Sequence, residues 1–307
     1  MRELGIRIID KDGNVKLEKI DTEEVRLVFK ETYEEGDKIV FTTSEKNTYL
    51  YAQVDDAMGE SFVYVTDNEI VYEIPFGEKR ISYSPKVFHG DTHLLSLRFA
   101  KKEEIESYKN LALNVIDKQE IKGVYPHASA NIETRGEAVF AARNAINGNC
   151  ENQSHGRWPY ESWGIGMRDD ACFRLDFGRS IITNKIIIYT RSDFPHDNWW
   201  IKATLRFSDG SEIVWNLEKS DKAHVLEFKE KTIEWLTFSD LIKADDPSPF
   251  PALSAFPRGY APRPLLCPAA STPGGFFPCG GQTHIPARSA LIPPCSKNKT
   301  PCYRSSR

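Results

Sequence analysis

The sequence predicts an all-β protein with two jelly-roll-like β-sandwich domains in tandem, followed by a disordered tail. Three observations lead to this prediction. Short runs rich in β-branched and aromatic residues recur through most of the chain, and turn residues separate them. A polar, helix-prone stretch at residues 101–108 interrupts the runs once. After residue 253 the composition changes, and no period that could specify a core face continues.

Residues 1–100 are predicted to form the first sandwich. Short strands separated by turns are typical of sandwiches and barrels. No catalytic motif occurs here. Asp55 and Asp56 follow a strand and could bind a cation, or they could form an ordinary solvated turn. The strands are expected at residues 24–30, 38–43, 48–54, 61–65, 69–74, 80–84 and 93–100.

Residues 101–109 are predicted to be a linker, and residues 110–253 the second sandwich. Residues 136–148 have apolar side chains at helical spacing and end in a glycine, which predicts a helix. The strands of this part are expected at residues 172–177, 185–190, 201–207, 212–216, 224–228 and 232–238.

Several motifs of residues 110–253 follow one another in the order known from one family. They are NLA (110–112), ASAN (128–131), AINGN (145–149), a tryptophan at 158 or 163, LDFG (175–178), IIIY (186–189) and FSDG (207–210). This block resembles the discoidin family, also called the coagulation factor five/eight type C domain. Many bacterial carbohydrate-binding modules share this galactose-binding-like fold. The resemblance implies a jelly-roll sandwich that binds a glycan, without catalysis, in loops at one end.

The resemblance also bears on metal binding and on the end of the domain. Many members hold a structural calcium beside an AxDGN turn, but here Asn147 replaces the aspartate, which removes a charged oxygen ligand. No other cofactor is expected. Family members finish with a strand that pairs back near the start of the domain, and the sequence before residue 253 has no such strand.

A loop after the strand at 185–190 holds the candidate ligand-binding residues. A sugar site needs an aromatic platform beside side chains that form paired hydrogen bonds. A second aromatic loop at 155–163 is expected to form the opposite wall. Alternatively, one of the two adjacent tryptophans points into the core, and the charged residues form an internal salt-bridge network. The candidates are Arg191, Asp193, His196, Asp197, Asn198, Trp199 and Trp200, with Trp158 and Tyr160 from the second loop.

The charge balance and the motifs of the sequence also bear on functions other than glycan binding. Residues 1–253 carry 33 Lys/Arg and all 44 Asp/Glu, which gives 33 − 44 = −11 and argues against nucleic acid and anionic membranes as partners. His127, His155 and His196 with Asp193, Asp197 and Glu161 could form an acid–base site, but no known catalytic spacing occurs. A protein partner of the same aromatic loop is a further alternative. No export signal or membrane-spanning run is seen, so a cytoplasmic location is expected.

Residues 254–307 differ from the rest of the chain. They hold ten of the 18 prolines and four of the six cysteines, and they lack acidic residues. The cysteines at 267, 279, 295 and 302 are not spaced as in structural zinc sites. The favoured hypothesis is an out-of-frame translation after residue 253, which would remove the closing strand. A natural disordered tail is the alternative.

Overall fold

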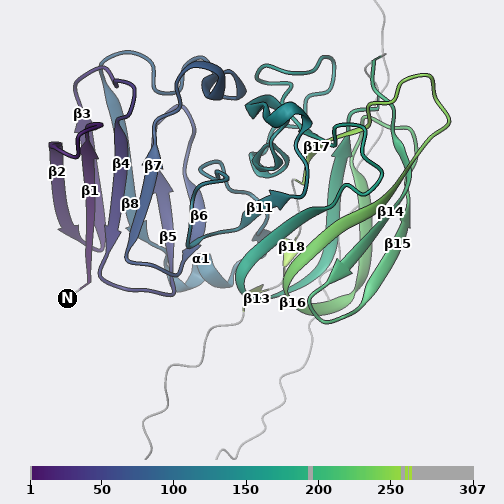
Figure 1. The fold of residues 1–307 in the computed structure, drawn as a ribbon. Helices are drawn as coiled ribbons and strands as arrows, with labels where there is room; N and C mark the ends of the chain where they lie inside the picture. The colour runs from purple at the N-terminus through teal and green to yellow at the C-terminus, as the bar shows by residue number, and fades with distance from the viewer. Residues whose placement is uncertain (1, 193–195, 257–259, 262, 265–307) are drawn as a thin grey trace, which may run out of the picture. The chain divides into compact units, whose positions relative to one another are not determined.

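The computed structural model describes residues 2–192, 196–256, 260–261 and 263–264. These residues belong to one compact unit. Their regular structure is almost entirely antiparallel β-sheet, which confirms the predicted fold class (Figure 1). Within the described residues, the single α-helix is α1 (Lys102–Glu106), in the stretch expected to be helix-prone.

The first group of strands forms two sheets that enclose one apolar core. One sheet has the order β2 (Val15–Thr22), β1 (Glu3–Ile9), β4 (Lys38–Thr43) and β7 (Glu69–Glu73). The other has the order β10 (Val124–Tyr125), β6 (Ser61–Val65), β5 (Thr48–Gln53), β8 (His93–Phe99) and β3 (Glu24–Phe29). Alternate residues face the core, as the period of two in a strand requires.

Two predictions for this first sandwich need correction. Strands β1 and β2 were not expected, because β2 is an exposed edge strand whose sequence does not alternate. The strand expected at 80–84 is wrong, since the 3-10 helix η1 (Gly77–Ser82) occupies most of it. Arg80 fixes this helix by donating to the carbonyl oxygens of Val87 and Phe88.

The second group of strands forms the sheet that carries the second core (green in Figure 1). Its order is β12 (Trp163–Gly164), β17 (Ala252–Ala255), β13 (Phe173–Thr190), β16 (His224–Lys243), β14 (Trp200–Phe207) and β15 (Glu212–Asn216). Two further strands pair with β13, namely β11 (His127–Ala130) and β19 (Arg263–Pro264). The strands expected at 172–177 and 185–190 are both parts of β13, and those expected at 224–228 and 232–238 are both parts of β16.

The helix expected at 136–148 is wrong. Three short 3-10 helices replace it: η2 (Thr134–Gly136), η3 (Ala138–Phe140) and η4 (Ala142–Ile146). Glu137 and Ala141 between them have extended backbone, which no α-helix tolerates. The apolar residues of the pattern still face the core, because Val139, Ala142 and Ile146 are buried.

The structure describes the first residues of the segment that was expected to be the tail. Ser254 and Ala255 belong to β17, and Phe256 packs between Phe173 and Phe238 in the second core. A strand that returns to the start of the second sandwich is present, since β18 (Tyr260–Ala261) pairs with β9 (Lys109–Asn110). The four tail cysteines lie outside the described residues, and the out-of-frame origin stays a prediction.

The boundary between the two cores does not coincide with the predicted linker at residues 101–109. Ile116, Ile121 and Val124 pack in the first core, although they follow residue 110. Leu111 and Ala112 pack in the second. The segment between the two sandwiches thus contributes to both cores, and the predicted domain boundaries stay predictions.

Candidate functional site

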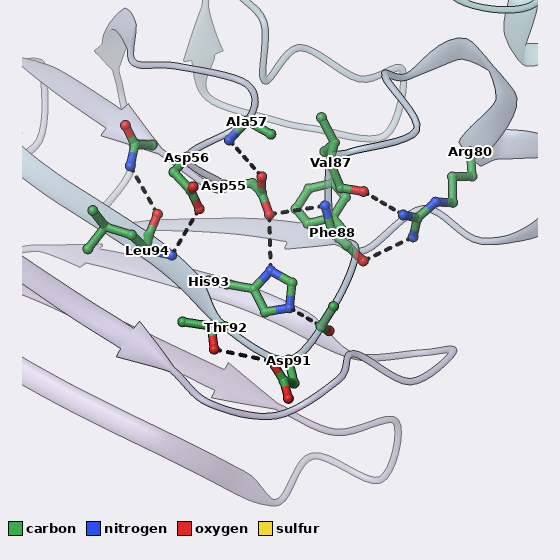
Figure 2. Close-up of polar contacts among 12 residues, drawn as sticks. Asp55, Asp56, Ala57, Arg80, Val87, Phe88, Asp91, Thr92, His93 and Leu94 are labelled. Atoms are coloured by element: carbon green, nitrogen blue, oxygen red, sulfur yellow. Dashed lines mark hydrogen bonds and ion pairs between the residues drawn. The ribbon is translucent and has the colours of Figure 1, made fainter.

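In the Asp55–Asp56 turn of the first sandwich, Asp56 is exposed, whereas Asp55 belongs to a buried hydrogen-bond network (Figure 2). Asp55 is buried, and its carboxylate accepts hydrogen bonds from the backbone N–H groups of Ala57 at 2.9 Å and Phe88 at 3.0 Å. His93 Nδ1 lies 3.2 Å from the same carboxylate, and its Nε2 lies 3.2 Å from the Gly90 carbonyl. This network fixes the loop after β5 to the loop before β8.

The second sandwich has a cavity of about 170 Å³ at one end, which we call the loop-end cavity. Four separate chain segments line it, and several of them carry aromatic side chains. The lining residues are Thr134, Arg135, Phe140, His155, Ser162, Gly164, Ile165, Gly166, Met167, Arg191, His196, Asp197, Phe250, Pro251 and Ala252.

Backbone hydrogen bonds hold the loop after β13 against the segment before β17. The Arg191 N–H donates to the Ala252 carbonyl at 3.1 Å, and the Asn198 N–H donates to the Phe250 carbonyl at 3.3 Å. The Asn198 side-chain amide donates to the carbonyls of Ala244 and Ser248, at 3.1 and 2.7 Å. Asn198 is fully buried, so it positions the loop.

On the opposite side, β12 lies close to η2 and η3. The Gly166 N–H donates to Thr134 Oγ1 at 2.9 Å. A Cβ atom added at Gly164 would lie 2.6 Å from Thr134 Oγ1 and 3.2 Å from Phe140, so only glycine allows this approach.

Arg191 and Asp197 form a buried ion pair beside the cavity. Arg191 Nε donates to Asp197 Oδ2 at 2.9 Å, and both side chains are almost inaccessible to solvent. Arg191 Nη1 donates to the Tyr160 carbonyl at 2.6 Å, and Nη2 donates to the Ser154 carbonyl. The guanidinium therefore ties the loop at 154–160 to the loop after β13. Desolvation of the Arg191 guanidinium lowers its pKa, and Asp197 counteracts this effect.

An aromatic stack runs along the same cavity. The rings of His155 and His196 stack at a centroid distance of 4.7 Å, and those of His196 and Phe250 at 4.8 Å with an interplanar angle of 2°. Phe140 stacks on His155 at 6.5 Å. Phe250 exposes 40% of its surface and the His196 side chain 47%, so the stack offers apolar surface to a ligand.

The environment of this stack disfavours the charged form of His155. Partial burial and the nearby Arg191 guanidinium lower the pKa of His155. His155 is therefore mainly neutral at neutral pH. His196 Nδ1 lies 3.4 Å from Asp197 Oδ1, which connects the stack to the buried ion pair.

Of the residues predicted in the loop after β13, three line the cavity: Arg191, His196 and Asp197. Trp200 is dropped from the candidate site because it is fully buried in the second core, as strand alternation implied for one of the two tryptophans. Trp199 is half-buried, with Lys219 Nζ 4.7 Å from its ring centroid. Asp193 lies outside the described residues.

The two residues predicted in the second loop do not line this cavity. Tyr160 contributes its backbone carbonyl to Arg191. Trp158 is 39% exposed and lines a different cavity, beside the first sandwich. Trp163 is fully buried in the second core, as the family resemblance implied.

The turn at Asn147 places two side-chain amides beside one carboxylate oxygen. Asn147 Nδ2 donates to Glu161 Oε1 at 2.8 Å, and the Asn149 amide donates to the same oxygen. Calcium takes about 6–8 oxygen ligands, whereas the carboxylate here receives N–H donors. In the described part of the chain, no group of three or more His, Cys, Asp or Glu side chains could hold a metal. The other oxygen of this carboxylate, Glu161 Oε2, is buried and has no hydrogen-bond partner, and calcium at this turn stays a prediction.

The sequence did not predict the residues of the site that lie far along the chain from the loop after β13. Phe140, Met167 and Phe250 line the cavity but lie far from the predicted loop in sequence. The rigid PSPFP segment at 247–251 could have indicated Phe250 as a site residue. This phenylalanine stands between two prolines, so it cannot be part of a regular strand.

The comparisons with known proteins give fold likeness only. No family model matches the chain, and no curated protein matches it. No helix of the described residues is long and apolar enough to cross a membrane.

Solved structures resemble about half of the chain. Chitosan-binding module 1 from a Paenibacillus sp. IK-5 chitosanase/glucanase is 16% identical, with 50% of this chain and 97% of the module covered and a TM-score of 0.34. The family 32 CBM of C. perfringens NanJ, in complex with galactose, is 18% identical, with 42% and 88% covered and a TM-score of 0.33. A Streptococcus pneumoniae fucose binding module is 13% identical, with 50% and 94% covered and a TM-score of 0.34. Similarities with such low identities and TM-scores give no information about the function of this chain.

Proposed function

We propose that the chain is a non-catalytic carbohydrate-binding protein that holds a sugar in the loop-end cavity. The observation that carries the proposal is the exposed stack of His196 and Phe250 beside the buried Arg191–Asp197 pair. A sugar ring has an apolar face, which packs on an aromatic ring, and hydroxyl groups, which bind ionised side chains.

The size of the cavity indicates the size of the ligand. Pockets for drug-sized ligands measure about 300–1,000 Å³, and the loop-end cavity is smaller, at about 170 Å³. It therefore suits one sugar ring, such as the terminal residue of a glycan.

The lining favours binding over hydrolysis. Asp197 is the one carboxylate among the described lining residues, and it is paired with Arg191. Glycoside hydrolysis generally needs two carboxyl groups across the scissile bond. A carboxylate that is held by a guanidinium and almost inaccessible to solvent is poorly placed to act as a nucleophile or a general acid.

A glycan array of neutral sugars, followed by calorimetry on the best ligand, tests the proposal. We expect Phe250→Ala and His196→Ala each to weaken binding by about twofold to tenfold, since one aromatic contact contributes about 0.5–1.5 kcal/mol beyond its buried area. Lys19→Ala on β2, away from the cavity, is the matched control and should bind normally. Absence of binding to every neutral sugar, or unchanged binding by both variants, would contradict the proposal. Turnover of the bound glycan would contradict its non-catalytic part.

A further inference from the structure

A second cavity, of about 370 Å³, contains an unusual buried cation. We call it the Arg143 cavity. Residues 82–87 and Met58 of the first sandwich line it, together with Val115, Arg143, Asn147, Asn149 and Trp158. The Trp158 N–H donates to the Ile81 carbonyl at 3.0 Å, so the tryptophan loop is fixed against η1.

Arg143 forms no direct ion pair among the described residues. Burial acts to lower its pKa, but Tyr83, Tyr72 and the carboxylates of Asp117 and Glu161 together raise it. Arg143 is 8% exposed. Its Nε donates to the Asp117 carbonyl at 2.8 Å, and its Nη1 contacts Asn144 Oδ1 at 3.2 Å and Ser82 Oγ at 3.5 Å, all neutral acceptors. The Tyr83 ring lies 4.3 Å from its Cζ.

The neighbouring carboxylate of Asp117 is already used. It accepts from His127 Nδ1 at 2.8 Å and from the Ala128 N–H at 2.9 Å. A buried guanidinium stays protonated, and a buried charge without an ionic partner is costly. An anion bound in the Arg143 cavity would give this guanidinium a direct ionic partner, which the described residues do not supply.

The other lining residues indicate what kind of anion would fit. Lys86 is exposed at the rim, so two cations line the cavity, and no carboxylate occurs among its described lining residues. Trp158 supplies an exposed aromatic surface, and Ser82, Ser84, Asn147 and Asn149 supply hydroxyl and amide groups.

We propose that the Arg143 cavity is a second binding site, which takes a sugar acid. Its carboxylate would lie at Arg143 and Lys86, and its ring would pack on Trp158. An aromatic surface with polar groups around a cationic end matches an amphipathic ring that carries one carboxylate. This inference does not rest on the function proposed for the loop-end cavity, because the two cavities share no lining residue.

Calorimetry of the full chain with D-glucuronic acid and with D-galacturonic acid tests the proposal. Glucose and acetate serve as ligand controls. We expect at least one of the two acids to bind, and Lys86→Ala and Trp158→Ala each to weaken that binding by about fivefold to tenfold. Arg143→Met should abolish it. Since Arg143→Met could also unfold the chain, the two variants at exposed positions decide the outcome.

The controls distinguish this site from the loop-end cavity. Lys19→Ala and His196→Ala should leave binding of the sugar acid unchanged. Loss of that binding in His196→Ala, with Lys86→Ala unaffected, would assign the ligand to the loop-end cavity and overturn the inference. Absence of binding by both acids overturns it too. Acetate that binds as tightly as the acids would overturn the sugar part. Glucose that binds as tightly, and loses that binding in Trp158→Ala but not in His196→Ala, would overturn the role of the carboxylate.

Discussion

The loops of both sandwiches are held by a buried polar network, but the charged side chains of the network line a described cavity only in the second sandwich. In the first sandwich, Asp55 and His93 are enclosed, and the rings of Phe29 and Tyr33 contact His93 at centroid distances of 6.3 and 4.4 Å. In the second, the Arg191–Asp197 pair lines the loop-end cavity. A buried His or Asp in a loop therefore does not by itself mark a functional site.

The largest expected effect is at Arg191. Replacement by methionine leaves the Asp197 carboxylate buried and unpaired, and it removes the bonds to the carbonyls of Ser154 and Tyr160. We expect Arg191→Met to lower the free energy of unfolding by about 3–5 kcal/mol, measured by urea denaturation.

The double variant Arg191→Met/Asp197→Leu is the control for this prediction. It removes both charges, so it should be more stable than Arg191→Met alone. A double variant that is less stable than the single one would show that the ion pair is not the source of the loss.

The next effect is at Asp55 of the first sandwich. Asp55→Ala leaves the buried N–H of Phe88 and the ring of His93 without their acceptor. We expect the free energy of unfolding to fall by about 2–3 kcal/mol. The neighbouring Asp56→Ala is the matched control and should cost less than about 1 kcal/mol, because Asp56 is exposed and accepts one bond from the Leu94 N–H. Equal losses of stability in Asp55→Ala and Asp56→Ala would show that the buried position of Asp55 makes no difference.

His196 should separate stability from binding. Its side chain is half-exposed and stacks between His155 and Phe250. His196→Ala is expected to change the free energy of unfolding by about 0.5 kcal/mol or less, since exposed positions tolerate substitution. The same protein sample should show the weakened sugar binding described above. A loss of stability comparable to that of Asp55→Ala would mean that His196 fixes the fold.

The smallest effect concerns pH and His155. Its pKa is lowered from the ordinary 6.5, so the unfolded chain binds more protons than the folded one below that value. This contribution to stability is complete above about pH 6.5 and declines as the pH falls through the folded pKa. We expect His155→Gln to reduce the loss of stability between pH 7 and pH 5 by about 0.5 kcal/mol or less, because the side chain is largely exposed to solvent. If the stability of His155→Gln fell more steeply between pH 7 and pH 5 than that of the unchanged protein, the predicted direction of the effect would be wrong.

The sequence predicted most strands because alternation of apolar residues reports a half-buried strand directly. It did not predict β2, whose exposed residues do not alternate, or the 3-10 helices η2–η4, whose apolar residues follow helical spacing without helical backbone. For the site, Arg191, His196 and Asp197 were found because they lie in one loop. Phe140 and Phe250 were not, because their nearness to that loop depends on how distant segments pack.

The placement of β17 affects how the second sandwich can form during synthesis. Its residues Ala252–Ala255 lie between β12 and β13, and the Ala252 carbonyl accepts the Arg191 N–H. The loop-end cavity therefore cannot assemble until the chain through residue 256 has left the ribosome, long after the first sandwich is complete. Until then the loop after β13 lacks its partner, so the nascent second sandwich depends on late translation in a way that the first does not.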